Sequence, residues 1–458
     1  NEPFQLAGTA IADWQVNPQH ENSDWGYELA KKQVGKPTGI VGASDPELLP
    51  NFDREYREIL PRGQEMSNNA FRMSLDFAEL CPERGIFDEA KMAHCVRVLA
   101  RCIYLGMEPM VTLNHWTLPK TFAKYNHRGR IKNGPLEHPD IVRHFEFYVD
   151  KVADFLFDPE KIKKALKGED YKKEFVERLC DERNICKWFI SLNEPVNMIF
   201  TPYIAGAFPP YHVLGFRKYK IMREKLREMH AISYHRLHNK AVRASQRKNN
   251  DIKIGMAHNV TLPTSIPIFE SHGNWGLVEE MENGAETDIM GIQYYFRILF
   301  GLNGIKGSDP KYHSDHPQFG QVYPAGVFDV LQFAGEKWPK KELVLSEFGF
   351  ADKTDLKRPD WILQTVHHLI RAKKAGVNVT GALLWSLITN FEWIKGMNTP
   401  FGVYDAHGQR LQSDNGRNIS SREVWTQASK HLLHPTAQSA QELQNLRRLT
   451  KRQLDATN

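Results

Sequence analysis

The chain has 458 residues, of which 41% are hydrophobic and 11% aromatic, the composition of a folded globular protein with room for one large domain or two to three ordinary ones. The 60 basic and 55 acidic residues are interspersed, and the net charge of +5 is too small and diffuse to indicate nucleic-acid binding. No apolar run approaches the ~18 residues that a membrane span needs, so no membrane partner is expected.

The cysteines give no sign of a disulfide framework or a zinc site, because they are odd in number and lack CxxC spacing. They are Cys81, Cys95, Cys102, Cys180 and Cys186. This usage favours a reducing, cytoplasmic compartment. The chain begins at Asn1 rather than Met, so the alternative of a secreted mature form is kept. No cofactor or metal is expected.

Short apolar runs alternate with longer helical patterns from one end of the chain to the other. The predicted strands are, in order, Phe4–Ala10, Phe71–Asp76, Glu108–Asn114, Trp188–Leu192, Ile252–Ala257, Ile289–Gln293, Glu342–Ser346 and Gly381–Trp385. The helical patterns between them include Asp88–Leu105, Ile141–Phe157, Tyr219–Gln246, Val327–Trp338 and Trp361–Ala375. This alternation, with no linker to divide it, predicts an α/β fold: one (β/α)8 TIM barrel with its active site at the C-terminal ends of the strands.

Two segments are distinguished from the barrel, which we place at residues 1–435. Residues 158–184 are dense in charge and predict an exposed helical insertion before the fourth strand. Residues 436–458 are expected to form a C-terminal tail, helical or frayed.

Polar residues follow the predicted strands at the face of the barrel that carries active sites. Arg72 lies in the second strand, Asn193 and Glu194 follow the fourth, and Glu347 follows the seventh. The two glutamates are expected to face each other across the mouth of the barrel. Paired carboxylates flanking one bond are what glycoside hydrolysis requires.

The motifs at these strand ends resemble those of the family-1 glycoside hydrolases, the β-glucosidases and their relatives. SLNEP at 191–195 is similar to the family's T-x-N-E-P motif, and LSEFG at 345–349 is similar to its I-T-E-N-G motif. WSL at 385–387 with NFEW at 390–393 matches the family's W-S-L-x-D-N-F-E-W segment closely, and further matches are WQV at 14–16, FRMS at 71–74 and TLNHW at 112–116. The resemblance covers nearly the whole chain, with the motifs in the correct order.

The resemblance implies a retaining exo-β-glycosidase that works through two glutamates. Glu347 would be the nucleophile and Glu194 the acid/base, with carboxyls about 5–5.5 Å apart. Arg72 would keep Glu347 ionised, and Tyr295 would donate a hydrogen bond to it. Tyr294 is the rival of Tyr295, because a shift of one residue in a strand exchanges its faces.

The family pattern also implies a set of sugar contacts. Asn193 would hold the 2-hydroxyl of the sugar. The remaining binding residues would be Gln15, His115, Trp116, Trp385, Glu392, Trp393 and Phe401. Glu392 stands where members acting on 6-phosphoglycosides usually carry Ser, and a carboxylate would repel a phosphate. The expected substrate is therefore an unphosphorylated β-D-glucoside, with β-galactosides and β-fucosides next.

Departures from the family pattern surround the nucleophile and the rim rather than the two glutamates. They are Asn17-Pro18, Thr117, Gln293, Phe348 and Thr389. Two alternatives therefore stay open: a transglycosidase, whose acceptor site would use Phe348, Gln293 and the loop 197–211, and a sugar-binding pseudoenzyme. The sequences of the rim loops Thr121–Pro135 and Gly301–Phe319 do not predict a substrate specificity. The sequence likewise does not predict the aglycone, the oligomeric state or any partner protein.

Overall fold

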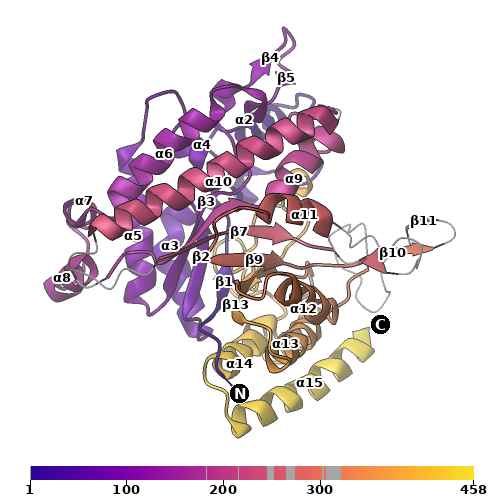
Figure 1. The fold of residues 1–458 in the computed structure, drawn as a ribbon. Coiled ribbons are helices and arrows are strands. Elements are labelled where there is room, and N and C mark those ends of the chain that lie inside the picture. Colours follow the sequence, from indigo (N-terminus) through magenta and orange to yellow (C-terminus); the bar gives the residue numbers. More distant parts are fainter. Residues whose placement is uncertain are drawn as a thin grey trace.

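The computed structural model describes residues 2–457 except 182, 215, 245–251, 262, 265–273, 302–303 and 306–320. Eight parallel strands close into a barrel in the order β1-β13-β12-β9-β7-β6-β3-β2 (Figure 1). Their bounds are β1 Leu6–Ala10, β2 Ala70–Ser74, β3 Glu108–Asn114, β6 Trp188–Asn193, β7 Lys253–Asn259, β9 Ile289–Gln293, β12 Glu342–Phe348 and β13 Val379–Trp385. The predicted (β/α)8 barrel is confirmed, and each predicted strand corresponds to one barrel strand.

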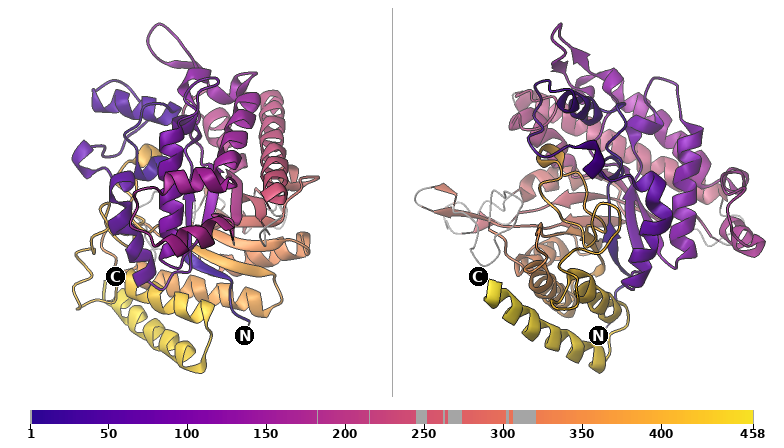
Figure 2. Two further views of the ribbon diagram at one scale, coloured as in Figure 1. Left: turned by 90° about the vertical axis from the view of Figure 1, so that its left-hand side faces the viewer. Right: turned by 180° about the vertical axis from the view of Figure 1, so that it is seen from behind.

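Helices lie between successive strands and cover the outside of the barrel (Figures 1 and 2). The longer ones are α2 Asp24–Gln33, α3 Phe52–Glu65, α5 Glu89–Tyr104, α6 Ile141–Leu156, α10 Phe216–Ala244, α11 Trp275–Glu282, α12 Gly326–Lys337, α13 Arg358–Lys374 and α14 Ser421–Leu433. The sequence sets such a helix locally: in α5, the Asp88 side chain caps the N-terminus, and Met92, Val96 and Leu99 form one buried stripe. The predicted pattern Tyr219–Gln246 corresponds to α10, although positions 245 and 246 lie outside the described residues.

Two apolar layers result from the alternation of side chains along each strand. Residues such as Leu6, Met110 and Val344 fill the inside of the barrel. Their neighbours in sequence, such as Val111 and Leu345, pack outward against the helices. Inward-facing positions near the C-terminal ends of the strands therefore lie at one mouth of the barrel.

The two segments distinguished in the sequence are helical in the structure. The insertion contains α7 (Pro159–Ala165) and α8 (Lys173–Asp181), and Phe175 of α8 packs edge-on against Tyr104 of α5 at 5.4 Å. The C-terminal segment forms α15 (Ala437–Thr457), which lies along the bottom of the view in Figure 1. Leu454 is fully buried, and Arg447 donates a hydrogen bond to Gln364 of α13 at 2.6 Å. Helix α15 is thus packed against the barrel.

Several short helices and strands lie in the loops that follow the barrel strands. They are α1 (Asp13–Val16), α4 (Phe77–Leu80), α9 (Pro195–Ile199), and the hairpin of β4 (Lys124–Tyr125) and β5 (Ile131–Asn133). In the rim loop Gly301–Phe319, positions 302–303 and 306–319 lie outside the described residues. Within the described part of the chain, no helix combines the length and the apolar character needed to cross a membrane.

Candidate active site

Glu194 follows β6 directly and lies at the N-terminus of α9. Its backbone is left-handed (φ 48°, ψ 56°), which is unusual for a non-glycine residue. Its amide donates to the carbonyl of Ala257 at 2.7 Å, which ties the turn to β7. Asn197 donates to Oε2 at 2.7 Å and Asn259 donates to Oε1 at 3.3 Å, so both carboxyl oxygens have a partner. The sequence did not predict a contact of either asparagine with Glu194, although Asn197 begins the loop 197–211 considered for an acceptor site.

Glu347 lies near the end of β12, with its side chain directed into the mouth. The Arg72 guanidinium donates to Oε1 in a buried ion pair, and the Tyr295 hydroxyl donates to Oε2 at 2.8 Å. The hydroxyl of Tyr294 donates instead to the carbonyl of Tyr323 at 3.0 Å, in the outer layer. The structure therefore brings Tyr295, and not Tyr294, to Glu347.

Arg72 connects four barrel strands through its guanidinium. Besides Glu347, it donates to Thr112 Oγ1 at 3.0 Å, to the carbonyl of Ser346 at 3.2 Å and to Asn193 Oδ1 at 2.6 Å. These partners lie in β3, β12 and β6, and Arg72 lies in β2. The planar donor fork fixes the relative positions of these strand ends.

The two glutamates differ in the charges that surround them. Burial and then the negative charge of Glu347 raise the pKa of Glu194 to about 8, against the opposing effect of Asn197 and Asn259. Burial also raises the pKa of Glu347, but the Arg72 charge and the Tyr295 hydrogen bond counteract it. Because a cation touches Glu347 and two neutral amides touch Glu194, a proton shared by the pair resides on Glu194.

A chain of hydrogen bonds fixes the orientation of three side chains beside this pair. Asn193 Oδ1 accepts from Arg72 and, at 2.7 Å, from Gln293 Nε2. The Asn193 amide must therefore donate to His115 Nε2, which is 3.0 Å away. His115 is then neutral with its proton on Nδ1, in line with the lowering of its pKa by burial and by the Arg72 charge. Among the described residues, neither His115 Nδ1 nor Gln293 Oε1 has a hydrogen-bond partner, and both are buried.

Glu392 is the third carboxyl at the mouth. Its Oε2 accepts from Gln15 at 3.1 Å and from Asn390 at 3.0 Å. Burial raises its pKa to about 7, and the charge of Glu347 acts in the same direction. Gln15 Nε2 also donates to the Phe391 carbonyl. The buried Gln15 Oε1 has no hydrogen-bond partner in the described part of the chain.

Aromatic rings enclose these polar groups. Trp385 stacks on His115 with ring centroids 5.8 Å apart, and Trp393 stacks on Trp116 at 4.8 Å. Phe401 meets Tyr295 edge-on at 5.9 Å. The site residues predicted from the sequence thus lie at the mouth in several contacting groups, which we together call the mouth ring.

Phe348 does not belong to the mouth ring, and the expectation that it would act in an acceptor site is wrong. Its ring packs against Trp361 at 6.0 Å and Trp425 at 5.7 Å in the outer layer. The reason is a register shift in β12 after Leu345: it turns Glu347 into the mouth, so the next residue, Phe348, faces outward like Leu345.

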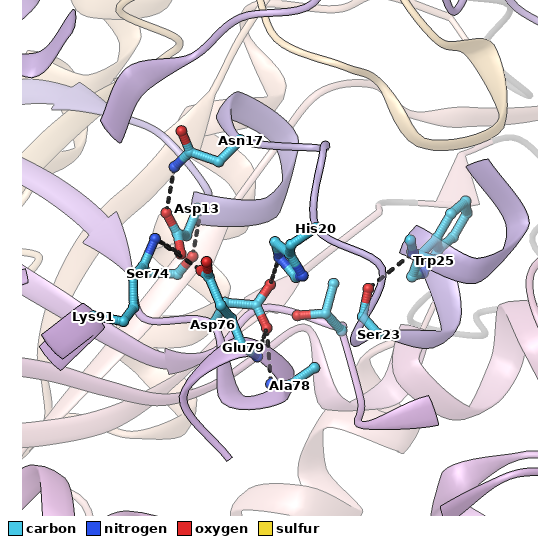
Figure 3. Close-up of polar contacts among 12 residues, drawn as sticks. Asp13, Asn17, His20, Ser23, Trp25, Ser74, Asp76, Ala78, Glu79 and Lys91 are labelled. Carbon is cyan, nitrogen blue, oxygen red and sulfur yellow. Dashed lines mark hydrogen bonds and ion pairs between the residues drawn. The ribbon is translucent and has the colours of Figure 1, made fainter. Parts of the chain in front are cut away.

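A second group of buried and half-buried charges adjoins the mouth ring at α1, which carries both Asp13 and Gln15. Lys91 of α5 forms ion pairs with Asp13, Asp53 and Glu79, the first at 3.7 Å and the last at 2.8 Å. His20 pairs with Asp76 at 3.0 Å. Figure 3 shows Asp13, Glu79 and Lys91 directed toward one another, with the His20–Asp76 pair next to them. We call these six residues the Lys91 cluster.

A closed parallel (β/α)8 barrel whose mouth holds two buried, interacting carboxyl groups is the architecture of a glycoside hydrolase. The chain belongs to glycosyl hydrolase family 1, whose family model matches residues 5–167 and 301–428, and it is a β-glucosidase-like hydrolase of O-glycosides. Glu347 lies within the second matched stretch, and Glu194 lies between the two.

Curated relatives span most of the chain at low identity. Beta-glucosidase A of Acetivibrio thermocellus is 23% identical, over 91% of this chain and 95% of its own length. 6-Phospho-beta-galactosidase 1 of Streptococcus pneumoniae is 22% identical, over 87% of this chain and 92% of its own. The chain spans only 50% of the beta-glucosidase-like SFR2 protein of Oryza sativa, at 24% identity.

Solved structures share the fold. The beta-glycosidase from Pyrococcus horikoshii aligns over 98% of this chain and 97% of its own, with a TM-score of 0.71 and 23% identity. The family 1 β-glucosidase from Thermotoga maritima also reaches a TM-score of 0.71, at 18% identity over 94% of this chain and 98% of its own.

Proposed function

We propose that this protein is a retaining exo-β-glycosidase that hydrolyses unphosphorylated β-D-glucosides, with Glu347 as nucleophile and Glu194 as acid/base. The observation that carries the proposal is the unequal treatment of the two carboxyls. Glu347 is held by the Arg72 cation and the Tyr295 hydroxyl, whereas the pKa of Glu194 is raised to about 8. One carboxylate and one carboxylic acid are what the first step of this reaction requires.

In that first step, a carboxylate oxygen of Glu347 forms a bond to the anomeric carbon. The bond from that carbon to the glycosidic oxygen breaks, and Glu194 donates its proton to the departing oxygen. The products are the free alcohol and a sugar joined to Glu347 as an ester.

In the second step, water replaces the ester. Esterification removes the negative charge of Glu347, which is one cause of the raised pKa of Glu194, so that pKa falls. Glu194 is then a carboxylate and takes a proton from water, whose oxygen forms a bond to the anomeric carbon as the ester bond breaks. Both glutamates return to their starting protonation states.

The unpartnered atoms of the mouth ring suit a sugar bearing several hydroxyls. His115 Nδ1–H offers a donor, and Gln15 Oε1 and Gln293 Oε1 offer acceptors. Trp385 supplies an apolar face of the kind that packs against a sugar ring. Asn193 lies next to Glu194 and would hold the 2-hydroxyl of the bound sugar.

Glu392 supports a substrate without a phosphate. Its carboxyl is buried and accepts hydrogen bonds from Gln15 and Asn390, so its remaining acceptor capacity favours sugar hydroxyls. No cation contacts it among its described partners, so a phosphate placed there would meet like charge.

The experiment that tests the proposal is mass spectrometry after incubation with 2-deoxy-2-fluoro-β-glucosyl fluoride. The fluorine at position 2 slows the second step, so the glycosyl-enzyme ester accumulates. We expect one adduct per chain, mapped by peptide analysis to Glu347. An adduct on another residue would overturn the assignment of the nucleophile. The absence of both an adduct and turnover of nitrophenyl β-glycosides would point to a sugar-binding protein.

A further inference from the structure

Two segments of the rim lack acidic residues altogether. Residues 115–136 contain Lys120, Lys124, Arg128, Arg130 and Lys132 and no Asp or Glu. Residues 195–223 contain Arg217, Lys218, Lys220 and Arg223 and again no Asp or Glu. In a chain with nearly equal numbers of bases and acids, two such stretches concentrate positive charge if they meet in space.

The fold brings the two segments together. The first forms the β4–β5 hairpin after β3, and the second forms the turn after β6 and the start of α10. Figure 1 shows the hairpin projecting from the body of the molecule at the top of the view. Lys124 of the hairpin and Lys218 of α10 line the same groove, which has a volume of about 280 Å³. The dispersed charge of the sequence therefore becomes a local excess in the folded chain.

The hairpin cations are not neutralised by neighbours. Lys124, Arg128, Arg130 and Lys132 are exposed, and none has an ion-pair partner among the described residues. On the α10 side, Glu137 does pair with Lys218, at 3.2 Å. By contrast, the rim segment after β1, residues 17–49, has five acids against three lysines, so it does not share the excess of positive charge.

Apolar side chains are exposed within the same two segments. Tyr125 lies next to Lys124, and Ile221 lines the groove with a relative exposure of 54%. Val213 is 66% exposed, and its neighbour His212 contacts Glu137, which also lines the groove. The floor of the groove is apolar, with Phe122, Leu136 and Met222.

We propose that the two rim segments without acidic residues, 115–136 and 195–223, form a basic sector that is a docking surface for an anionic lipid bilayer. Docking through this surface places the mouth of the barrel near the membrane. Exposed cations interspersed with exposed aliphatic and aromatic side chains match the interface of such a bilayer, which offers negative head groups above an apolar interior. A soluble polyanion would be matched by the cations alone, and the exposed apolar side chains favour the bilayer. Peripheral docking of this kind needs no membrane span.

The test is flotation of the full-length protein with phosphatidylcholine vesicles, with and without phosphatidylglycerol. We expect binding only to vesicles that contain phosphatidylglycerol, and weaker binding at high salt because exposed charges are screened. The variant Lys124→Gln/Arg128→Gln/Arg130→Gln/Lys132→Gln should bind at least about tenfold more weakly. The matched control Lys164→Gln/Lys167→Gln/Lys172→Gln/Lys173→Gln removes the same charge from the exposed insertion and should bind normally. Ile221→Ser tests the apolar contribution and should also weaken binding.

Several results would overturn the proposal. They are equal flotation with both kinds of vesicle, equal loss in the control variant, or retention on a soluble polyanion such as heparin without flotation. Self-association that Ile221→Ser abolishes, without flotation, would assign the surface to a second copy of the chain. Hydrolysis of a soluble nitrophenyl glycoside should be unchanged in all three variants, which shows that they fold. The docking does not depend on the proposed catalysis, so a Glu347→Gln protein should float like the parent.

Discussion

The mouth ring and the Lys91 cluster are two groups of charged residues that adjoin at α1, and their charges have different partners. In the Lys91 cluster, carboxylates surround a buried ammonium or imidazole, and nearly every charge meets an opposite one. In the mouth ring, Arg72 is the cation that touches a carboxyl, and Glu194 and Glu392 are contacted by neutral amides. Burial alone therefore does not mark a functional site.

This difference determines which charged groups are available to a ligand. A group that is saturated by ion pairs within the protein has no capacity left for a substrate, and breaking it costs stability. A carboxyl held by neutral donors has no counter-ion to lose and keeps acceptor capacity for a ligand. On this reasoning, substitutions in the mouth ring should reduce turnover, and substitutions in the Lys91 cluster should reduce stability.

The largest expected effect is on turnover. Glu347→Gln removes the proposed nucleophile but preserves the shape of the side chain, and kcat should fall by at least about 10⁴-fold. The amide oxygen can still accept from Arg72 and the amide nitrogen can donate to the Tyr295 hydroxyl, but Arg72 loses its buried counter-ion, so the unfolding midpoint should fall as well. Initial rates with a nitrophenyl β-glucoside and a thermal denaturation curve measure both quantities. Activity within tenfold of the parent would remove Glu347 from the mechanism.

The next effect is on stability. Lys91→Met leaves the buried Asp13 and the half-buried Asp53 and Glu79 without their shared cation, and the free energy of unfolding should fall by about 3 kcal/mol. Urea denaturation measures this loss, and kcat of the folded fraction should stay within about tenfold of the parent. Lys173→Met, which breaks the exposed Lys173–Glu177 pair, is the control and should change stability little. A large loss of kcat with unchanged stability would assign Lys91 to the active site.

A smaller effect depends on pH. Burial opposes the charged form of His20, but the charge and hydrogen bond of Asp76 outweigh it and raise the pKa of His20 to about 9. A pKa raised on folding stabilises the protein fully below the unfolded value of about 6.5, and this stabilisation is lost as the pH rises through about 9. The difference in unfolding free energy between parent and His20→Gln should therefore shrink by about 3 kcal/mol across that window. A difference that is constant with pH would contradict the ion pair.

The smallest effect is a shift in the pH profile. Asn197 donates to Glu194 and favours its charged form, so Asn197→Ala should raise the pKa of Glu194 above about 8. The alkaline limb of kcat/KM should then move upward by up to about one pH unit. Asn259→Ala should shift the limb in the same direction. Asn17→Ala, which removes an amide that contacts Asp13 in the Lys91 cluster, should leave the limb in place.

The sequence predicted the barrel because each strand is a short apolar run between helices, and parallel closure then places every strand end at one mouth. It predicted the mouth ring because its members follow those strands in recognisable motifs. Asn197 and Asn259 were missed for different reasons. Asn197 comes into reach only because the chain turns sharply at Glu194, and Asn259 ends β7 two residues beyond the predicted strand.

The Lys91 cluster could not have been predicted, because its members come from separate elements and no local pattern joins them. The sequence around Lys91 predicts only an ordinary helix residue. The packing of α5 against α1 and α4 buries Lys91 and brings it into contact with carboxylates. The misplacement of Phe348 has the opposite origin. It was assigned by its position next to Glu347 in sequence, although neighbours in a strand face opposite sides.

Because the mouth ring has unpartnered hydrogen-bonding atoms, binding of the proposed sugar can be followed through the thermal stability of the folded protein. A sugar whose hydroxyls satisfy Gln15, Gln293 and His115 binds the native state and not the unfolded chain, so it raises the melting temperature. At a concentration of 100 times Kd, the gain is about 2.7 kcal/mol. A series of monosaccharides that differ in one hydroxyl can thus be ranked by melting alone, even in Glu347→Gln, where nothing is turned over.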